Sequence, residues 1–412
     1  MIILDKIELL APAGDFERLQ VAVAFGADAV YMGGTAFGLR AAAKNFDAEQ
    51  MAAAIEYAHE RGVKVYVTAN IFAHNTDLEG MAEYFCEVQK MGADALIISD
   101  PGVFAIARRT VPDMEIHIST QANITNYASA LFWAGQGASR IILARELSLG
   151  EISEIHEKIK GKIVLEAFVH GAVCMAYSGR CFLSAYMNNR DANKGECANN
   201  CRFKYALAEE QRPGEYFPIA ETDGRGSHIL SSKDLCMIGH LPEMIDAGIT
   251  SLKIEGRMKT PHYVAAVVSA YRTAIDDFYS GHELYKSKIL QYMLDLQKSA
   301  NRDFSTGFYV DRPSSDAQAF YGKHSKTYDF VGIVRDYDNE SGIATIEQRN
   351  KFVIGETVEF LRAGCEPFSQ EITEMLDVDG NSVDAARHAQ QILKIRVTEP
   401  VSALDIMRVK MQ

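Results

Sequence analysis

Eight short apolar segments recur between residues 7 and 257, and amphipathic helical patterns separate most of them. The segments cover residues 7–10, 29–32, 64–68, 95–99, 116–120, 140–143, 163–168 and 251–254. Alternation of strands and helices implies a parallel sheet, and eight units predict an α/β fold in which a TIM-like (β/α)8 barrel closes on itself. The alternative is an open doubly wound sheet, but its first turn normally carries GxGxxG. Here the first turn reads Ala11-Pro12-Ala13-Gly14.

Two of the intervening helices have readable ends. Asp15 is placed to cap a helix that stops near Gly26, and Asp47 to cap one that stops near Gly62. An acidic N-cap followed by a terminal glycine is the usual pair of helix boundary signals.

The seventh unit is irregular. After residue 168 the chain enters a cysteine-rich insertion, residues 170–225, instead of a plain helix. Segments that follow the carboxyl end of a barrel strand lie on the catalytic face. We therefore expect this insertion to lie over the mouth of the barrel.

Four of the seven cysteines fall in this insertion with the spacing C-x6-C-x15-C-x3-C: Cys174, Cys181, Cys197 and Cys201. The N-terminus has no basic stretch followed by an apolar one, so we expect a cytoplasmic protein in which disulfides are rare. The wide spacing favours an iron–sulfur cluster. A zinc site, which usually pairs its cysteines more tightly, and unligated structural cysteines stay open.

The insertion is also locally basic. Residues 178–205 carry a charge of +3 in a chain whose net charge is −13, with aromatic residues interleaved. Basic and aromatic side chains together are typical of single-stranded RNA surfaces. The candidate RNA-binding residues are Arg180, Arg190, Lys194, Arg202 and Lys204. A solvated loop with aromatics packed beneath it is the alternative, and the acidic remainder excludes a general nucleic-acid binder.

Polar residues near the predicted strand ends form the candidate site. The candidate substrate-binding residues are Arg40, Lys44, Asn70, Gln121, Arg145, Lys253, Glu255 and Arg257, and the candidate catalytic residues are Glu166, His170 and Tyr177. Because guanidinium groups hold carboxylates with paired hydrogen bonds, the cations predict a small dianionic ligand. Each cation taken alone could equally be an ion-paired residue of the barrel rim.

Beyond the barrel, residues 1–260, the pattern changes twice. Residues 261–322 predict a helical linker whose first helix starts at Thr260-Pro261 and stops at Gly281. Residues 323–412 show period-two alternation, which predicts a small all-β barrel domain. No run of eighteen apolar residues occurs, so we expect no membrane span.

Five stretches resemble the collagenase-like peptidases, peptidase family U thirty-two. They are ELLAPAG, GADAVYMGG, FGLRAAAKNF, EAFVHGAVCMAYSGRCFLS and SLKIEGRMK. Within the family, the likeness is greatest to members that hydroxylate the wobble uridine of tRNA to 5-hydroxyuridine without molecular oxygen, with prephenate as a required metabolite. Other members hydroxylate a ribosomal RNA cytidine or a quinone precursor.

The resemblance implies several specific properties. The quinone-pathway relatives hold a 4Fe–4S cluster on four cysteines, which implies Cys174, Cys181 and Cys197 as ligands here. We assign the fourth ligand to Cys201, with Cys236 as the alternative. Prephenate is a dicarboxylate and agrees with the cationic rim.

Two other functions compete with tRNA hydroxylation. The family label implies a peptidase, but the sequence shows no HExxH, no GxSxG and no recognisable Cys-His-Asn spacing. A nucleophilic Cys181 with His170 as its base is conceivable, although it would leave the other clustered cysteines unexplained. The third possibility is a metal-stabilised RNA-binding adaptor that passes its substrate to a partner.

Overall fold

The computed structural model describes residues 6–38, 45–174, 176–177, 180–181, 183–192, 195–203, 206–214, 216–218, 232–311 and 326–411. The chain divides into two compact units. The first comprises Met1–Leu19, Asp28–Met258 and Arg302–Lys323, and the second comprises Gln20–Ala27, Lys259–Asn301 and His324–Gln412.

The first unit is a closed barrel of eight parallel strands, as the sequence predicts. The strands are β1 (Glu8–Pro12), β2 (Ala29–Gly33), β3 (Lys64–Ala69), β4 (Ala95–Ile98), β5 (Glu115–Ile118), β6 (Arg140–Ile142), β7 (Val164–Gly171) and β11 (Ser251–Ile254). They pair in sequence order from β1 to β7, and β11 pairs in parallel with both β1 and β7. The two pairings of β11 close the barrel.

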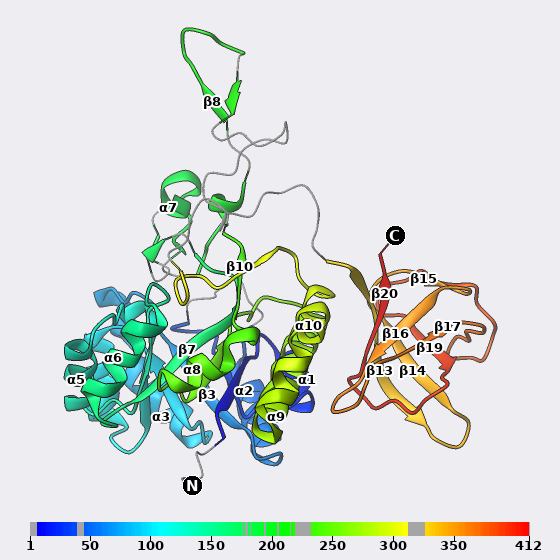
Figure 1. Cartoon of the computed structure of the whole chain (residues 1–412), viewed down its shortest axis with the longest axis horizontal. Helices are drawn as coiled ribbons and strands as arrows, with labels where there is room; N and C mark the ends of the chain where they lie inside the picture. The colour runs from blue at the N-terminus through cyan, green and yellow to red at the C-terminus, as the bar shows by residue number, and fades with distance from the viewer. Residues whose placement is uncertain are drawn as a thin grey trace. The chain divides into compact units, whose positions relative to one another are not determined.

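Helices follow most of these strands. They are α1 (Phe16–Ala24), α2 (Ala48–His59), α3 (Met81–Lys90), α4 (Pro101–Thr110), α5 (Tyr127–Gly135), α6 (Leu149–Ile159) and α8 (Leu241–Asp246). Both predicted N-caps are confirmed: the backbone N–H of Arg18 donates to Asp15, and that of Gln50 donates to Asp47. Figure 1 shows α5 and α6 outside the strands, at the left edge of this unit.

The insertion after β7 contains α7 (Leu183–Asn188), a short 3-10 helix η5 (Asn200–Arg202) and a two-stranded pairing of β8 (Ala206–Ala208) with β9 (Tyr216–Pro218). The chain then returns as β10 (Asp234–Cys236), antiparallel to β7, and β12 (Phe304–Ser305) adds beside β10. Arg302 pairs with Asp234 at 3.2 Å, and the Tyr309 hydroxyl donates to the carbonyl of Phe168. These contacts hold residues 302–309 against the barrel.

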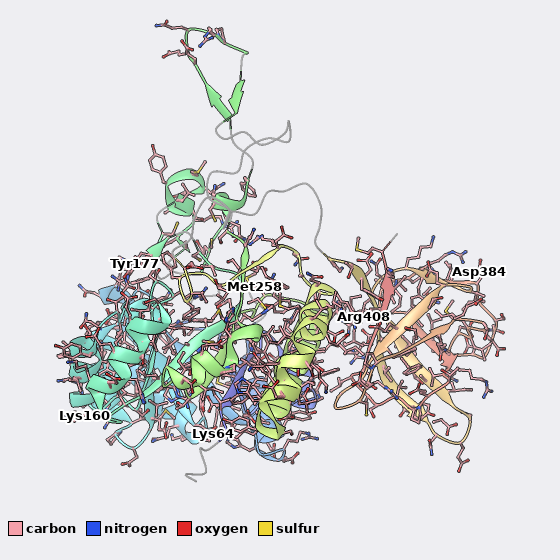
Figure 2. All side chains as sticks on the ribbon, viewed as in Figure 1. Lys64, Lys160, Tyr177, Met258, Asp384 and Arg408 are labelled. Atoms are coloured by element: carbon pink, nitrogen blue, oxygen red, sulfur yellow. The ribbon has the colours of Figure 1, made fainter. Side chains whose placement is uncertain are left out.

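The two ends of the barrel can be distinguished in Figure 2. Tyr177 and Met258, which follow β7 and β11, lie at one end, and Lys64 and Lys160, which begin β3 and precede β7, lie at the other. The insertion therefore begins at the carboxyl end of the strands, where the sequence predicts it. Among the described residues, no helix combines the length and the apolar character needed to cross a membrane.

The second unit contains two long helices and an antiparallel half-barrel. The helices are α9 (Pro261–Ser280), capped by Thr260, and α10 (His282–Gln297). The sheet has the order β17 (Phe368–Glu371), β16 (Thr357–Leu361), β20 (Ile406–Lys410), β13 (Tyr328–Asp338), β14 (Ile343–Gln348) and β19 (Ile392–Arg396), and β15 (Phe352–Val353) pairs separately with β18 (Ala385–Ala386). Alternate strand residues such as Val358, Phe360 and Ile346 form its core.

A buried charged cluster joins the helices of this unit to its sheet. Arg408 on β20 is fully buried and donates from Nε to Glu359 at 2.7 Å. Lys298, after α10, donates to the same carboxylate at 3.1 Å, and His262 on α9 lies 3.4 Å from Arg408. The helices that the sequence assigns to a linker thus cluster with the β-domain.

Candidate active site

A network of charged side chains crosses the interior of the barrel. Glu166, in the middle of β7, is 0% exposed and accepts hydrogen bonds from Lys253 Nζ at 2.7 Å and Arg140 Nη1 at 2.9 Å. Arg140 also pairs with Glu8, and Ser251 donates to Glu8 at 2.7 Å. Two acids thus face two bases, and the interior carries no net charge from these four groups.

The pairing determines the ionisation of the acids. Burial raises the pKa of Glu166, but the charges of Lys253 and Arg140 outweigh it, so that the pKa is lowered from its ordinary value. Burial likewise opposes ionisation of Glu8, and its hydrogen bond with Arg140 reverses the effect, so that this pKa is lowered too. Both side chains are therefore carboxylates at neutral pH.

Two of the candidate catalytic residues lie deeper than the sequence indicates. Strand β7 continues to Gly171, three residues beyond the predicted end at residue 168. Glu166 consequently belongs to the ion-paired interior, and its role there is to balance Lys253 and Arg140. His170 is also within β7 and buried, with its ring 5.3 Å from that of Phe304.

Toward the carboxyl end of the barrel, two aromatic rings lie beside two cations, Lys253 of this network and Arg145. Lys253, 4% exposed, lies 4.4 Å from the ring centre of Tyr31 and 5.6 Å from that of Phe168. The guanidinium of Arg145 lies 3.9 Å from the same Phe168 ring. Arg145 donates to the carbonyl of Ala172 at 2.8 Å, whereas its contact with Glu255 is 3.4 Å. That second contact is an ion pair, but it is longer than a strong charge-assisted hydrogen bond, which is about 2.7–2.9 Å.

Arg257 is the third cation of this region, and two glycines make room for it. Its guanidinium donates to Asn45 at 2.7 Å and Thr68 at 3.2 Å. A Cβ on Gly33 would lie 2.3 Å from Nη2 of this guanidinium, and one on Gly14 would lie 1.9 Å from the carbonyl oxygen of Arg257. Gly14, in the first turn, is thus required by the close approach of the chain after β11.

Amides from β3 and β5 complete the rim. Asn70 donates to Ser119 at 3.4 Å and to Gln121 at 3.3 Å. Its Oδ1 atom is buried and has no hydrogen-bond partner within the described residues. A buried acceptor of this kind is a natural contact for a ligand donor. The structure therefore brings Asn70, Gln121 and Arg145 to the same end of the barrel as Arg257.

The structure places the remaining predicted residues as follows. Arg40, Lys44, Lys194 and Lys204 lie outside the described residues, as does the side chain of Arg202. Arg180 donates from Nε and Nη2 to the carbonyl of Gln121 at 3.2 and 2.9 Å, so it fastens the insertion to the rim. Arg190 and Tyr177 are exposed.

The four clustered cysteines are at least partly accessible. Cys174 is exposed, and Cys181, Cys197 and Cys201 are intermediate, whereas the alternative ligand Cys236 is buried. Thiolates suit iron or zinc chemically. In the described part of the chain, however, no three Cys, His, Asp or Glu side chains lie together in a way that could hold a metal ion. The iron–sulfur cluster therefore stays a prediction.

Sequence reasoning missed part of this site. Glu8 and Arg140 stand at the starts of their strands, and the sequence does not predict a role for them or for the ring of Phe168. The available signal was a glutamate and an arginine as the first residues of otherwise apolar strands, because charged residues that point into a closed barrel must be paired.

The fold and this site define a class: a (β/α)8 barrel whose mouth combines cations, amides and aromatic rings, with a cysteine-rich insertion above them. The chain belongs to peptidase family U32. Residues 14–319 match that family, and residues 326–408 match its C-terminal domain.

Three relatives illustrate the functions found in the family. A Bacillus subtilis tRNA hydroxylation protein is 43% identical over 99% of this chain and 96% of its own length. An Escherichia coli 23S rRNA 5-hydroxycytidine synthase is 38% identical over 66% of this chain and 39% of its own length. A Porphyromonas gingivalis collagenase is 32% identical over 97% of both chains. The predicted family is thus confirmed, and all three names denote proteins of RNA modification or proteolysis.

Proposed function

We propose that the protein is an RNA-modifying enzyme that hydroxylates the wobble uridine of tRNA at C5, in the cytoplasm. The observation that carries this proposal is the 43% identity, across nearly the whole of both chains, with a protein named for tRNA hydroxylation. The rRNA relative, named for a 5-hydroxycytidine, suggests a common chemistry at C5 of a pyrimidine.

The barrel mouth supports a small dicarboxylate as co-substrate, which we propose to be prephenate. Arg145 is the cation best placed to meet one carboxylate, because its contact with Glu255 is long and its flat face lies on Phe168. Phe168 and Tyr31 offer apolar surface for a ring, and Asn70 offers an acceptor for a hydroxyl. Lys253 stays paired with Glu166, so the cation that we assign to the ligand is Arg145.

A titration of the purified protein tests this ligand directly. Prephenate should bind measurably by calorimetry, and phenylpyruvate, which lacks one carboxylate, should bind at least about tenfold more weakly, since a charge-assisted hydrogen bond contributes roughly 1.5–3 kcal/mol. Arg145→Met should remove this preference. Equal binding of the two acids by the unaltered protein would count against a dicarboxylate site.

The iron–sulfur cluster is a separate proposal that rests on the cysteine spacing and the family resemblance. When bound, such a cluster would supply electron transfer or structural support. Protein purified without oxygen should contain iron and sulfide, and Cys174→Ala, Cys181→Ala and Cys197→Ala should each lose them, whereas Cys86→Ser should not. Iron-free protein that still hydroxylates tRNA would refute this part alone.

The decisive experiment for the function is nucleoside analysis. Deleting the gene should abolish 5-hydroxyuridine in tRNA, and purified protein with prephenate should restore it to tRNA from the deletion strain. If restoration in vitro requires a second protein and this chain only delivers tRNA, the adaptor function replaces the enzymatic one.

Collagenase activity is the second candidate, because the Porphyromonas gingivalis relative covers nearly the whole chain. The peptidase function would be preferred if the purified protein cleaved gelatin and left tRNA unmodified, and if Cys181→Ala abolished the cleavage.

A further inference from the structure

The segment from Tyr177 to Phe203 exposes aromatic side chains to an unusual degree. Tyr186 on α7 is 90% exposed, more than any other large apolar side chain in the described part of the chain, and Tyr177 and Phe203 are 51% and 50% exposed. Met187, beside Tyr186, is also exposed. Rings in these positions contribute little to the packing of the barrel, so their exposure is better explained by contact with a binding partner.

These rings are carried by a framework with its own buried polar contacts. Ser184 on α7 is buried and accepts from the backbone N–H of Ala198 at 2.9 Å. Asn200, at the start of η5, is buried and donates to the side-chain oxygen of Asn188. Because α7 and η5 are fastened to each other, Tyr186 and Phe203 project from one folded element.

The framework is attached to the rim of the barrel. Three side chains donate hydrogen bonds to backbone carbonyls here. Arg180 donates to Gln121, Arg145 to Ala172, and Ser232 to Val173 at 2.5 Å. Figure 2 shows Tyr177 at the same end of the barrel as Met258. The exposed rings therefore belong to a segment that is anchored on the candidate active site.

The charge of the segment selects the kind of partner. The segment carries +2 in a chain of net charge −13, Lys204 follows it directly, and the side chain of Arg190, two residues beyond α7, is exposed. A polyanion is repelled by most of this chain and attracted here. Flat apolar rings beside positive charge match unpaired bases beside phosphates, since any base can stack on a ring.

We infer that Tyr186, together with Tyr177 and Phe203, forms a stacking surface for the unpaired bases of an RNA loop and holds that loop over the barrel mouth. The inference rests on the proposed RNA-modifying function and adds how the substrate is gripped. Base-paired RNA does not fit this surface, because its bases are already stacked within the helix.

Binding of a fluorescent RNA hairpin with a uridine-containing loop tests this surface. Tyr186→Ala should weaken the full-length protein's binding about 5- to 150-fold, the range expected from loss of one base–aromatic stack. Tyr186→Trp should retain binding, because the larger ring still stacks. The hairpin's strand annealed to its complement should compete poorly. Since the side chain of Tyr186 is 90% exposed, Tyr186→Ala should fold normally by circular dichroism.

Phe132→Ala is the matched control, because Phe132 on α5 is an exposed aromatic, 56% exposed, outside the segment. It should leave hairpin affinity unchanged. Equal affinities of Tyr186→Ala and the unaltered protein would overturn the inference, as would equal losses in Tyr186→Ala and Phe132→Ala, or binding of a protein partner by Tyr186 with no effect on RNA.

The outcome also separates this inference from the proposed function. If the unaltered protein restores 5-hydroxyuridine to tRNA while Tyr186→Ala binds the hairpin normally, the stacking surface is wrong and the function stands. If hairpin binding depends on Tyr186 but no tRNA is hydroxylated, the surface stands and the hydroxylase function fails.

Discussion

Replacing Glu166 by glutamine should unfold the barrel far more readily than an ordinary surface substitution. Glu166 is fully buried and is the shared partner of Lys253 and Arg140. Glu166→Gln keeps the shape but removes the charge, so that the four interior charges change from a balanced set to a net excess of +1. Glu8 alone then faces two buried cations.

The size of the effect follows from the two lost ion pairs. With an effective dielectric constant of about 20, the attraction within each charge pair at these separations is roughly 4 kcal/mol or more. The variant no longer has to take a charged carboxylate out of water, and this offsets part of the lost attraction. Removing one partner of a buried ion pair costs about 3–5 kcal/mol, and that is the expected loss here.

Urea titration followed by tryptophan fluorescence measures this loss. Trp133 is the single tryptophan of the chain and lies buried on α5, so its emission reports the barrel unit. Urea is preferred to guanidinium chloride, whose ions would screen the charges under test. Glu60→Gln, at an exposed surface pair with Arg61, is the control and should change stability by less than about 0.5 kcal/mol.

A double-mutant cycle decides whether charge is the cause. Lys253→Met combined with Glu166→Gln leaves Glu8 paired with Arg140 and restores balance. The double variant should therefore be more stable, by at least about 2 kcal/mol, than the sum of the single losses predicts. Losses that simply add would refute the reasoning, since they would show that Glu166 and Lys253 do not act on each other.

Three further results are expected. Folding lowers the pKa values of Glu8 and Glu166, so the stability that they confer is present above their ordinary value of 4.5 and is lost as the pH falls below it. Urea titrations followed by Trp133 fluorescence, from about pH 6 down to about pH 3, should show this loss, and Glu166→Gln should reduce it. Gly33→Ala places a Cβ 2.3 Å from the Arg257 guanidinium, so it should lower the free energy of unfolding by about 1–3 kcal/mol and weaken prephenate binding in calorimetry. The control is Gly150→Ala in α6, where the space around the glycine is open, and it should leave stability unchanged or slightly raised. Arg408→Met removes a buried partner of Glu359 and should lower the stability of the second unit by about 3 kcal/mol in scanning calorimetry; an unchanged transition would show that this pair is not stabilising.

The barrel could be predicted because each strand has a recognisable local sequence pattern. Apolar runs such as 64–68 and 95–99 are short, lie between amphipathic segments, and need no knowledge of distant residues. The same local reasoning found Asp47 as a helix cap and Gly281 as a helix end.

The interior network could not be predicted in this way. Glu8 and Arg140 are 132 residues apart and meet only because closure turns the first and sixth strands toward one axis. A glutamate near the end of an apolar run also looks like a residue of the barrel rim until the length of β7 is known, and this is why the sequence predicts Glu166 as a catalytic residue at the mouth. The cysteine segment has no period of either two or 3.6, so its spacing alone could not give its geometry.

The hydrogen bond between Ser251 and Glu8 spans 243 positions of the chain. During synthesis, Glu8 and Arg140 emerge from the ribosome long before the last strand that completes their surroundings. Until that strand arrives, closing the sheet would enclose charges that still lack Lys253, and contacts so distant in sequence form late. The nascent barrel should therefore remain open and hydrated until β11 has been translated, which makes its final strand the step that commits the chain to its native state.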